Sequence, residues 1–197
     1  MDRVSEFEQE ARAVAATVER LPRSAEAIAA AVLRVAAKTA ELASTERIAS
    51  QTQTSDAKEP TRIAIAASHD LPAELLDACR QLPGAFTGRT KHELAAADVG
   101  VTEAFAGIAR TGTICVCVDY EDEGYVSLLS RTHVAVLAAE NIVERPNDLL
   151  RRDCLAGKGL DRNFVYITGP SATADMGPLV RGVHGPHWLH ILILEMS

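Results

Sequence analysis

The apolar positions of this chain follow a helical period first and a strand period afterwards. Within residues 1–50, Ala, Val, Leu and Ile recur at helical spacing among Glu and Arg, as at Ile28 and Val32, which is typical of one face of an amphipathic helix. Pro22 divides this block into two runs, and Ser24 is a suitable N-cap for the second. We therefore predict an N-terminal helical arm over residues 1–50 that packs on the remaining domain or on a second subunit. An amphipathic membrane or regulatory helix is the other interpretation.

After a polar loop at residues 51–60, short apolar runs alternate with helical segments. We expect strands at residues 61–67, 98–101, 114–118, 133–137, 164–167 and 188–194, and helices at residues 71–81, 102–108 and 141–155. The acidic segment 120–130 is expected to form an exposed hairpin or lid, and the strand at 164–167 is expected to be buried. Strand–helix alternation of this kind is typical of an α/β fold with a mainly parallel sheet flanked by helices. Residues 60–197 are the predicted α/β domain.

Composition and charge narrow the class of protein. The chain has 197 residues with a formal net charge of −7. This charge argues against a protein that binds nucleic acid or anionic membranes, because such binding needs clustered Lys and Arg. The charged N-terminus lacks the apolar core of a signal peptide, and no window of the sequence approaches a membrane span. Four cysteines, at positions 79, 115, 117 and 154, match neither a disulfide framework nor a metal knuckle. These features favour a reduced, cytoplasmic protein, and no cofactor is expected in the chain.

Two turns combine glycine with hydroxyl side chains, namely Thr111-Gly112-Thr113 and Thr168-Gly169-Pro170-Ser171. Glycine lets the backbone approach a ligand closely, and the N–H and O–H groups can donate to an anionic oxygen. In an open α/β sheet such turns form a crevice at the carboxyl ends of the strands. We predict one crevice that binds a small anion or a partner; the candidate ligand-binding residues are Thr111, Gly112, Thr113, Gly169, Ser171, Thr173, Asp175 and His184. Plain turn chemistry is the other interpretation of these residues.

Histidines and cysteines suggest metal ligands, but their spacing is unsuitable. His184, His187 and His190 follow an H-x2-H-x2-H pattern, and an extended chain points residues three apart to opposite faces. We expect His184 to act as an acid, a base or a hydrogen-bond donor, because imidazole titrates near neutrality. His133 opens a strand and either faces the same crevice or is a core residue with its polar atoms satisfied. The paired Cys115 and Cys117 are expected to pack in the core, and no metal site is predicted.

Five ordered motifs resemble the LUD-domain family, specifically its lactate utilization protein C (LutC/YkgG) group. They are Asp98-Val99-Gly100-Val101-Thr102, Ile108-Ala109-Arg110-Thr111-Gly112-Thr113, His133-Val134-Ala135-Val136, residues 167–175 (ITGPSATAD) and residues 182–186 (GVHGP). The resemblance covers residues 60 to about 195. The sequence departs from the family pattern at Arg110, where an acidic or small residue is usual, and at Gly177, where a Glu is common.

The resemblance implies the α/β fold of ribose-5-phosphate isomerase, glucosamine-phosphate deaminase and CoA transferases (the NagB/RpiA/CoA transferase-like fold). It also implies a part in L-lactate oxidation to pyruvate with two partners, one cysteine-rich and one carrying iron–sulfur clusters. This chain lacks cluster-spaced cysteines, so it would be a non-redox accessory subunit. Two other hypotheses remain open: a stand-alone enzyme on a sugar-phosphate or acyl-CoA substrate, and a regulatory ligand sensor. Homo-oligomerisation is also left open.

Overall fold

The computed structural model describes residues 2–49, 61–66, 70–88, 90–118, 121–151, 163–174, 177 and 179–195. Its helices are α1 (Arg3–Ala13), α2 (Ala25–Ala49), α3 (Glu74–Arg80), α4 (Lys91–Ala95), α5 (Glu121–Leu129) and α6 (Pro146–Arg151), with short 3-10 helices η1 (Ala109–Thr111) and η2 (Ala139–Asn141). Its strands are β1 (Thr17–Leu21), β2 (Ile63–Ile65), β3 (Ala85–Phe86), β4 (Val99–Ala104), β5 (Ala106–Ile108), β6 (Thr113–Cys117), β7 (Thr132–Ala138), β8 (Ile142–Val143), β9 (Phe164–Ile167), β10 (Ala172–Thr173), β11 (Val180–Arg181) and β12 (Trp188–Leu194).

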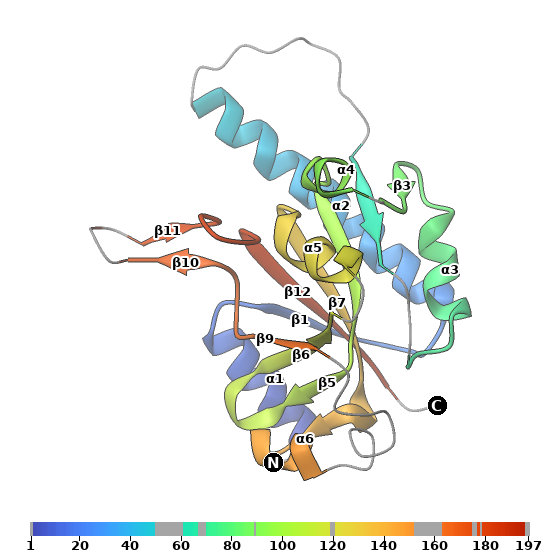
Figure 1. Cartoon of the computed structure of the whole chain (residues 1–197), viewed down its shortest axis with the longest axis vertical. Coiled ribbons are helices and arrows are strands. Elements are labelled where there is room, and N and C mark those ends of the chain that lie inside the picture. The colour runs from blue at the N-terminus through green and yellow to red at the C-terminus, as the bar shows by residue number, and fades with distance from the viewer. Residues whose placement is uncertain are drawn as a thin grey trace.

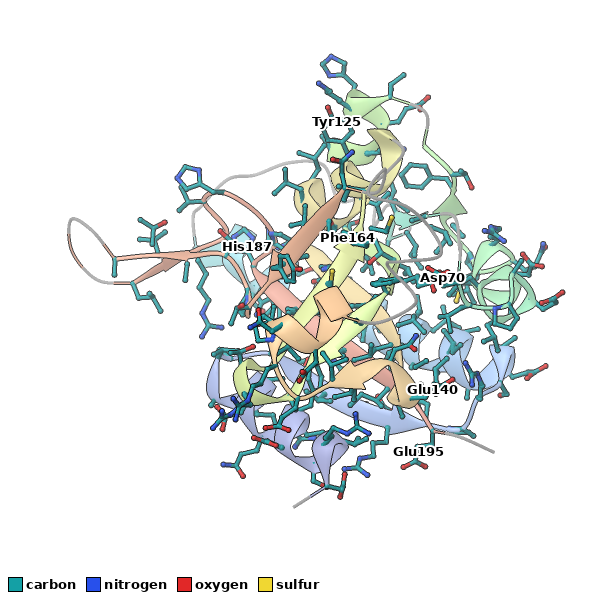
Figure 2. All side chains as sticks on the ribbon, turned by 60° about the horizontal axis from the view of Figure 1, so that its bottom comes forward. Asp70, Tyr125, Glu140, Phe164, His187 and Glu195 are labelled. Carbon is teal, nitrogen blue, oxygen red and sulfur yellow. The ribbon has the colours of Figure 1, made fainter. Side chains whose placement is uncertain are left out.

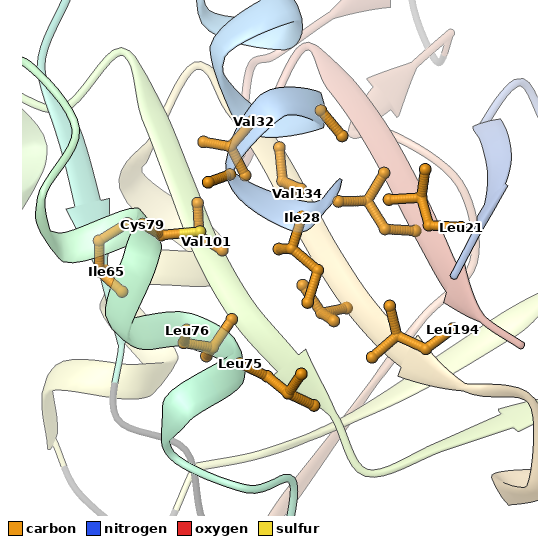
Figure 3. Packing of buried hydrophobic residues seen from close by; sticks show 14 of the residues in the cluster. Leu21, Ile28, Val32, Ile65, Leu75, Leu76, Cys79, Val101, Val134 and Leu194 are labelled. Atoms are coloured by element: carbon orange, nitrogen blue, oxygen red, sulfur yellow. The ribbon is translucent and has the colours of Figure 1, made fainter. Parts of the chain in front are cut away.

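A six-stranded sheet in the order β1-β12-β7-β4-β2-β3 forms the centre of the molecule, and all its pairings are parallel (Figure 1). Helices α2 and α3 cover one face, where Ile28 and Val32 pack with Leu76 and strand residues such as Val134 (Figure 3). This arrangement confirms the predicted α/β fold with a mainly parallel sheet. Among the described helices, none is both long and apolar enough to cross a membrane.

The first fifty residues contain a strand as well as helices. Strand β1 pairs in parallel with β12 over the full register from Thr17↔His190 to Leu21↔Leu194, although the sequence pattern predicted only helices here. Long-range pairing decides the outcome, since β12 offers a row of backbone donors and acceptors that local propensity does not reveal. Phe7 of α1 and Ile28 of α2 are both fully buried, so this block contributes directly to the core.

A second, four-stranded sheet in the order β8-β5-β6-β9 packs against the other face of the large sheet. The chain passes from β4 into β5 around Phe105, and every residue of both strands is buried. The predicted helix at residues 102–108 is therefore wrong. A strand that is buried on both faces is apolar throughout and lacks the alternation that would have identified it as a strand. The layer between the sheets contains Leu137, Ile191 and α1 residue Phe7.

Two more segments differ from the sequence-based expectation. The acidic segment expected to form a hairpin or lid contains helix α5. Strand β9 is the edge strand of the smaller sheet, antiparallel to β6, and its Val165 and Tyr166 are 42% and 48% exposed. The strand expected to be buried thus lies at an edge of the smaller sheet, and it is half-exposed: Phe164 and Ile167 pack against buried clusters while Val165 and Tyr166 reach the surface.

Candidate functional site

The smaller sheet brings the two hydroxyl-bearing turns together. Ile114 of β6 pairs with Ile167 of β9, so the start of one strand lies beside the end of the other. The Oγ1 atoms of Thr113 and Thr168 are 2.8 Å apart, and those of Thr111 and Thr113 are 2.7 Å apart. A short chain of hydroxyl hydrogen bonds therefore joins turns that are more than fifty positions apart in the sequence.

The glycines of these turns make room for the end of helix α1. Gly112 has φ +61°, and a Cβ placed there would lie 2.2 Å from the backbone nitrogen of Ala11. Gly169 has φ +75°, and its Cβ would lie 2.2 Å from the carbonyl oxygen of Val14. Left-handed backbone and close approach both favour glycine. Contact with α1 is thus sufficient to explain both glycines without a ligand.

A cavity of about 570 Å³ opens beside the second of the two turns. Its wall contains four of the sequence-predicted residues, Gly169, Ser171, Thr173 and His184. Thr111, Gly112 and Thr113 are not among the lining residues, and Asp175 lies outside the described residues. The remaining wall comes from the residue after β6, from α5, β9, the turn after β9, β10, the 184–186 turn and the large sheet: Val118, Gly124, Tyr125, Ser127, Leu128, His133, Val165, Tyr166, Ile167, Thr168, Pro170, Ala172, Gly185, Pro186 and Leu189.

The cavity lies at the amino ends of two parallel strands of the large sheet. His133 is the second residue of β7 and Leu189 the second of β12, and the two face each other in the strand register. The sequence analysis placed the crevice at the carboxyl ends, where open α/β sheets usually bind ligands. The second sheet explains the difference. Strand β9 and the loop after it lie over the amino ends of the large-sheet strands, and the cavity forms between them.

Ser171 links the turn at the cavity to the segment before β12. Its Oγ accepts a hydrogen bond from the backbone N–H of His184 at 3.2 Å. Its carbonyl oxygen accepts one from Gly182, and its own N–H donates to the carbonyl of Pro186, both at 2.9 Å. The backbone N–H groups of Ser171, Gly182 and His184 are therefore used within the protein. Of the two polar hydrogens of Ser171 itself, that of the hydroxyl is left for a ligand.

The three histidines of the H-x2-H-x2-H pattern lie in different surroundings. His184 is exposed at the cavity, while the ring of His187 packs beside Trp188, with ring centroids 5.4 Å apart. His190 contacts Thr17 and lies 3.7 Å from the carboxylate of Glu19 on β1. Burial lowers the pKa of His190, and the carboxylate of Glu19 opposes that shift. Within the described ranges, no group of three or more potential ligands could hold a metal ion.

Positive charge is scarce at the cavity. No lysine or arginine is found among its lining residues in the described part of the chain. Arg110 is exposed in η1 and does not line the cavity. Arg131 lies over the ring of Trp188, 5.4 Å from the ring centroid. A bound anion would therefore depend on the hydroxyl groups of the wall and on the ring of His184.

A buried carboxylate near the carboxyl ends of the large-sheet strands was not anticipated from the sequence. Glu103, near the carboxyl end of β4, is 8% exposed and accepts hydrogen bonds from the backbone N–H groups of Asp70 (3.2 Å) and Leu71 (2.7 Å). Asp70 lies toward α3, whereas His187 lies toward the β10–β11 hairpin (Figure 2). Glu103 therefore fixes the turn that precedes α3 and is separate from the cavity. A charged residue within an otherwise apolar strand was the only sequence signal for it.

Comparisons with known proteins place the chain among proteins with related sequences and folds. Lactate utilization protein C of Bacillus subtilis is 36% identical over 94 residues, which are 46% of this chain and 39% of that protein. Lactate utilization protein C 1 of Bacillus mycoides is 35% identical over 95 residues, which are 46% of this chain and 41% of that protein. Each match therefore spans less than half of the relative's length.

A solved structure and a family model extend the likeness to nearly the whole chain. A DUF162 family protein from Deinococcus radiodurans has a TM-score of 0.57 and 17% sequence identity, with 98% of this chain and 99% of that chain covered. This likeness concerns the fold alone. The model of the LUD domain matches residues 4–194, which includes α1 and β1 as well as the region that carries the motifs. The chain belongs to the LUD domain family.

Proposed function

We propose that this chain takes part in L-lactate utilization as a non-redox accessory subunit, acting with iron–sulfur and cysteine-rich partners that oxidise L-lactate to pyruvate. The observation that carries the proposal is the similarity to proteins named lactate utilization protein C, at 36% and 35% identity, within a chain of the LUD domain family. The cavity beside Ser171 and His184 is the site through which the subunit would bind its ligand or partner.

The cysteine chemistry supports a non-redox role. Cys79 and Cys115 are fully buried, and burial raises the pKa of their thiols to about 11 and about 12. Since the thiolate is the form that ligates metals and exchanges disulfides, these two residues are poorly suited to either task. We therefore assign electron transfer to the partners.

The cavity wall also bears on the two occupants that the sequence left open, a small anion or a partner. The wall provides hydroxyl groups but no lysine or arginine among its described residues, and the backbone N–H groups of Ser171 and His184 are already used. A strongly bound anion usually has charge-assisted hydrogen bonds. The lining therefore favours an uncharged occupant.

Growth of a deletion strain tests the proposal. Removal of the gene from its own organism is expected to slow growth on L-lactate and to leave growth on pyruvate unchanged, because pyruvate enters after the proposed step. Re-expression of the wild-type chain should restore growth. Asp175→Asn, a change at a position outside the described residues, is expected to restore it only in part while the protein accumulates normally. Equal growth of the deletion strain and its parent on L-lactate would contradict the proposal.

A further inference from the structure

The inner wall of the cavity contains a buried histidine with one unused ring nitrogen. His133 is 1% exposed and lines the cavity beside Leu189. Its Nε2 is 2.8 Å from the hydroxyl oxygen of Thr102 on the neighbouring strand β4. Its Nδ1 is buried and has no hydrogen-bond partner among the residues that the structure describes. An unpaired buried polar atom costs about 1–3 kcal/mol, so such an atom in a residue that lines a cavity calls for a partner.

His133 is neutral at physiological pH. Burial lowers its pKa from 6.5 to about 4, because a charged imidazolium is poorly solvated away from water. The ring therefore offers a hydrogen bond but no positive charge. Together with a wall that has no lysine or arginine among its described residues, this makes His133 a weaker anchor for a carboxylate or phosphate than a charged side chain.

The rest of the wall indicates the size and polarity of the ligand. Tyr125 and Leu128 come from α5, while Val165 and Ile167 come from β9, and these side chains form apolar sides to the cavity. A volume of about 570 Å³ falls within the range of sites that bind small organic molecules, roughly 300–1,000 Å³. Such sites combine apolar walls with a few polar groups that orient the ligand.

We propose that the cavity binds an uncharged, mainly apolar organic molecule with a hydroxyl group, and that this hydroxyl forms a hydrogen bond with Nδ1 of His133. A hydroxyl suits either tautomer of the ring. When Thr102 donates to Nε2, the N–H at Nδ1 donates to the ligand oxygen; when Nε2 donates to Thr102, Nδ1 accepts the ligand proton. The inference deepens the proposed function, since it concerns the same cavity, but it rests on the cavity wall and not on lactate metabolism.

Three aromatic probes of matched shape test the inference on the purified full-length chain at pH 7. 2-Naphthol has an apolar body and one hydroxyl, naphthalene lacks the hydroxyl, and 2-naphthoate replaces it with a carboxylate. A net hydrogen bond contributes about 0.5–1.5 kcal/mol; we therefore expect 2-naphthol to bind roughly 3- to 10-fold more tightly than naphthalene. We expect 2-naphthoate to bind no more tightly than naphthalene. Equal affinity for 2-naphthol and naphthalene, tightest binding of 2-naphthoate, or no binding of any probe would each overturn the proposal.

Two variants locate the probe. His133→Phe retains an aromatic ring of similar size and removes both nitrogens, so it should abolish the advantage of 2-naphthol over naphthalene. Leu128→Ala should weaken both probes several-fold, because Leu128 lines the cavity and is 48% exposed, which makes a folding defect from its truncation small. Leu33→Ala is the matched control, since Leu33 is 42% exposed on α2 and does not line the cavity. Unchanged probe affinities in Leu128→Ala would place the probe elsewhere and overturn the proposal, even where His133→Phe does not fold. These measurements use no lactate or partner, so their outcome is independent of the growth assay.

Discussion

Truncation of one α2 side chain tests whether the first fifty residues belong to the core. Ile28 is fully buried between α2 and the large sheet (Figure 3). Ile28→Ala removes three carbons at about 0.8 kcal/mol for each buried CH₂, which is about 2.4 kcal/mol. The cavity left behind adds to this loss, so we expect the free energy of unfolding to fall by about 3–4 kcal/mol. The melting temperature should fall by about 6–16 °C for a chain of this length.

Leu33→Ala on the same helix is the matched control. Leu33 is 42% exposed, so its truncation leaves no closed cavity, and we expect a loss of about 1 kcal/mol or less. Both variants should remain folded, because domains of this size typically have about 5–15 kcal/mol of stability.

Urea titration followed by tryptophan fluorescence is a suitable assay. The chain has one tryptophan, Trp188, which lies at the start of β12 in the large sheet. It therefore reports on the sheet and not on α2 itself. Circular dichroism of the same samples shows whether helices and sheet unfold together. An Ile28→Ala transition at Trp188 that coincides with that of the wild type would refute the reasoning and support a separable N-terminal arm.

His133 binds its proton more tightly in the unfolded chain than in the folded chain, where burial lowers its pKa from 6.5 to about 4. Its titration therefore leaves the free energy of unfolding unchanged above about pH 6.5 and lowers it by about 3 kcal/mol as the pH falls to 4. His133→Phe should flatten this part of the stability profile in urea titrations between pH 4 and 7, and a parallel profile would contradict the assignment. Gly112→Ala should lower the free energy of unfolding by at least about 2 kcal/mol through backbone strain and collision with α1. Gly124→Ala, in a helix with ordinary contact distances around the added carbon, should be neutral or slightly stabilising; similar melting temperatures for both glycine variants would argue against a close approach of α1. Cys79 and Cys115, with thiol pKa values raised by burial to about 11 and about 12, should resist iodoacetamide at pH 8 until urea unfolds the chain, and mass spectrometry that finds them labelled in the folded protein would disprove this.

The strands that the sequence predicted well are those whose local pattern is sufficient. The apolar runs at residues 133–137 and 188–194 correspond to β7 and β12, which lie inside the sheet and need continuous β-prone residues. The helix expected at residues 71–81 contains α3. In each case the local propensity and the final environment agree.

Segments whose structure depends on distant partners were not predicted. Strand β1 exists because β12 lies beside it, and β5 forms because β6 and β8 pair with it. No local signal distinguishes these runs from helices of similar composition. The same limit applies to the site. Strand ends indicated that the two turns could approach each other, but neither the contact of α1 with Gly112 and Gly169 nor the cavity wall at His133 could be inferred from spacing along the chain.

The parallel pairing of β1 with β12 also constrains the order of events during synthesis. Thr17 and His190 are 173 positions apart, and ribosomes add about 5–20 residues per second. The first strand of the sheet must therefore wait roughly 10–35 s for its neighbour to emerge. During that interval Phe7 and the apolar side of α1 have no completed layer to pack against. Such non-local closure slows folding and leaves apolar surface open to aggregation, so a nascent chain of this protein would benefit from chaperone protection of its first twenty residues.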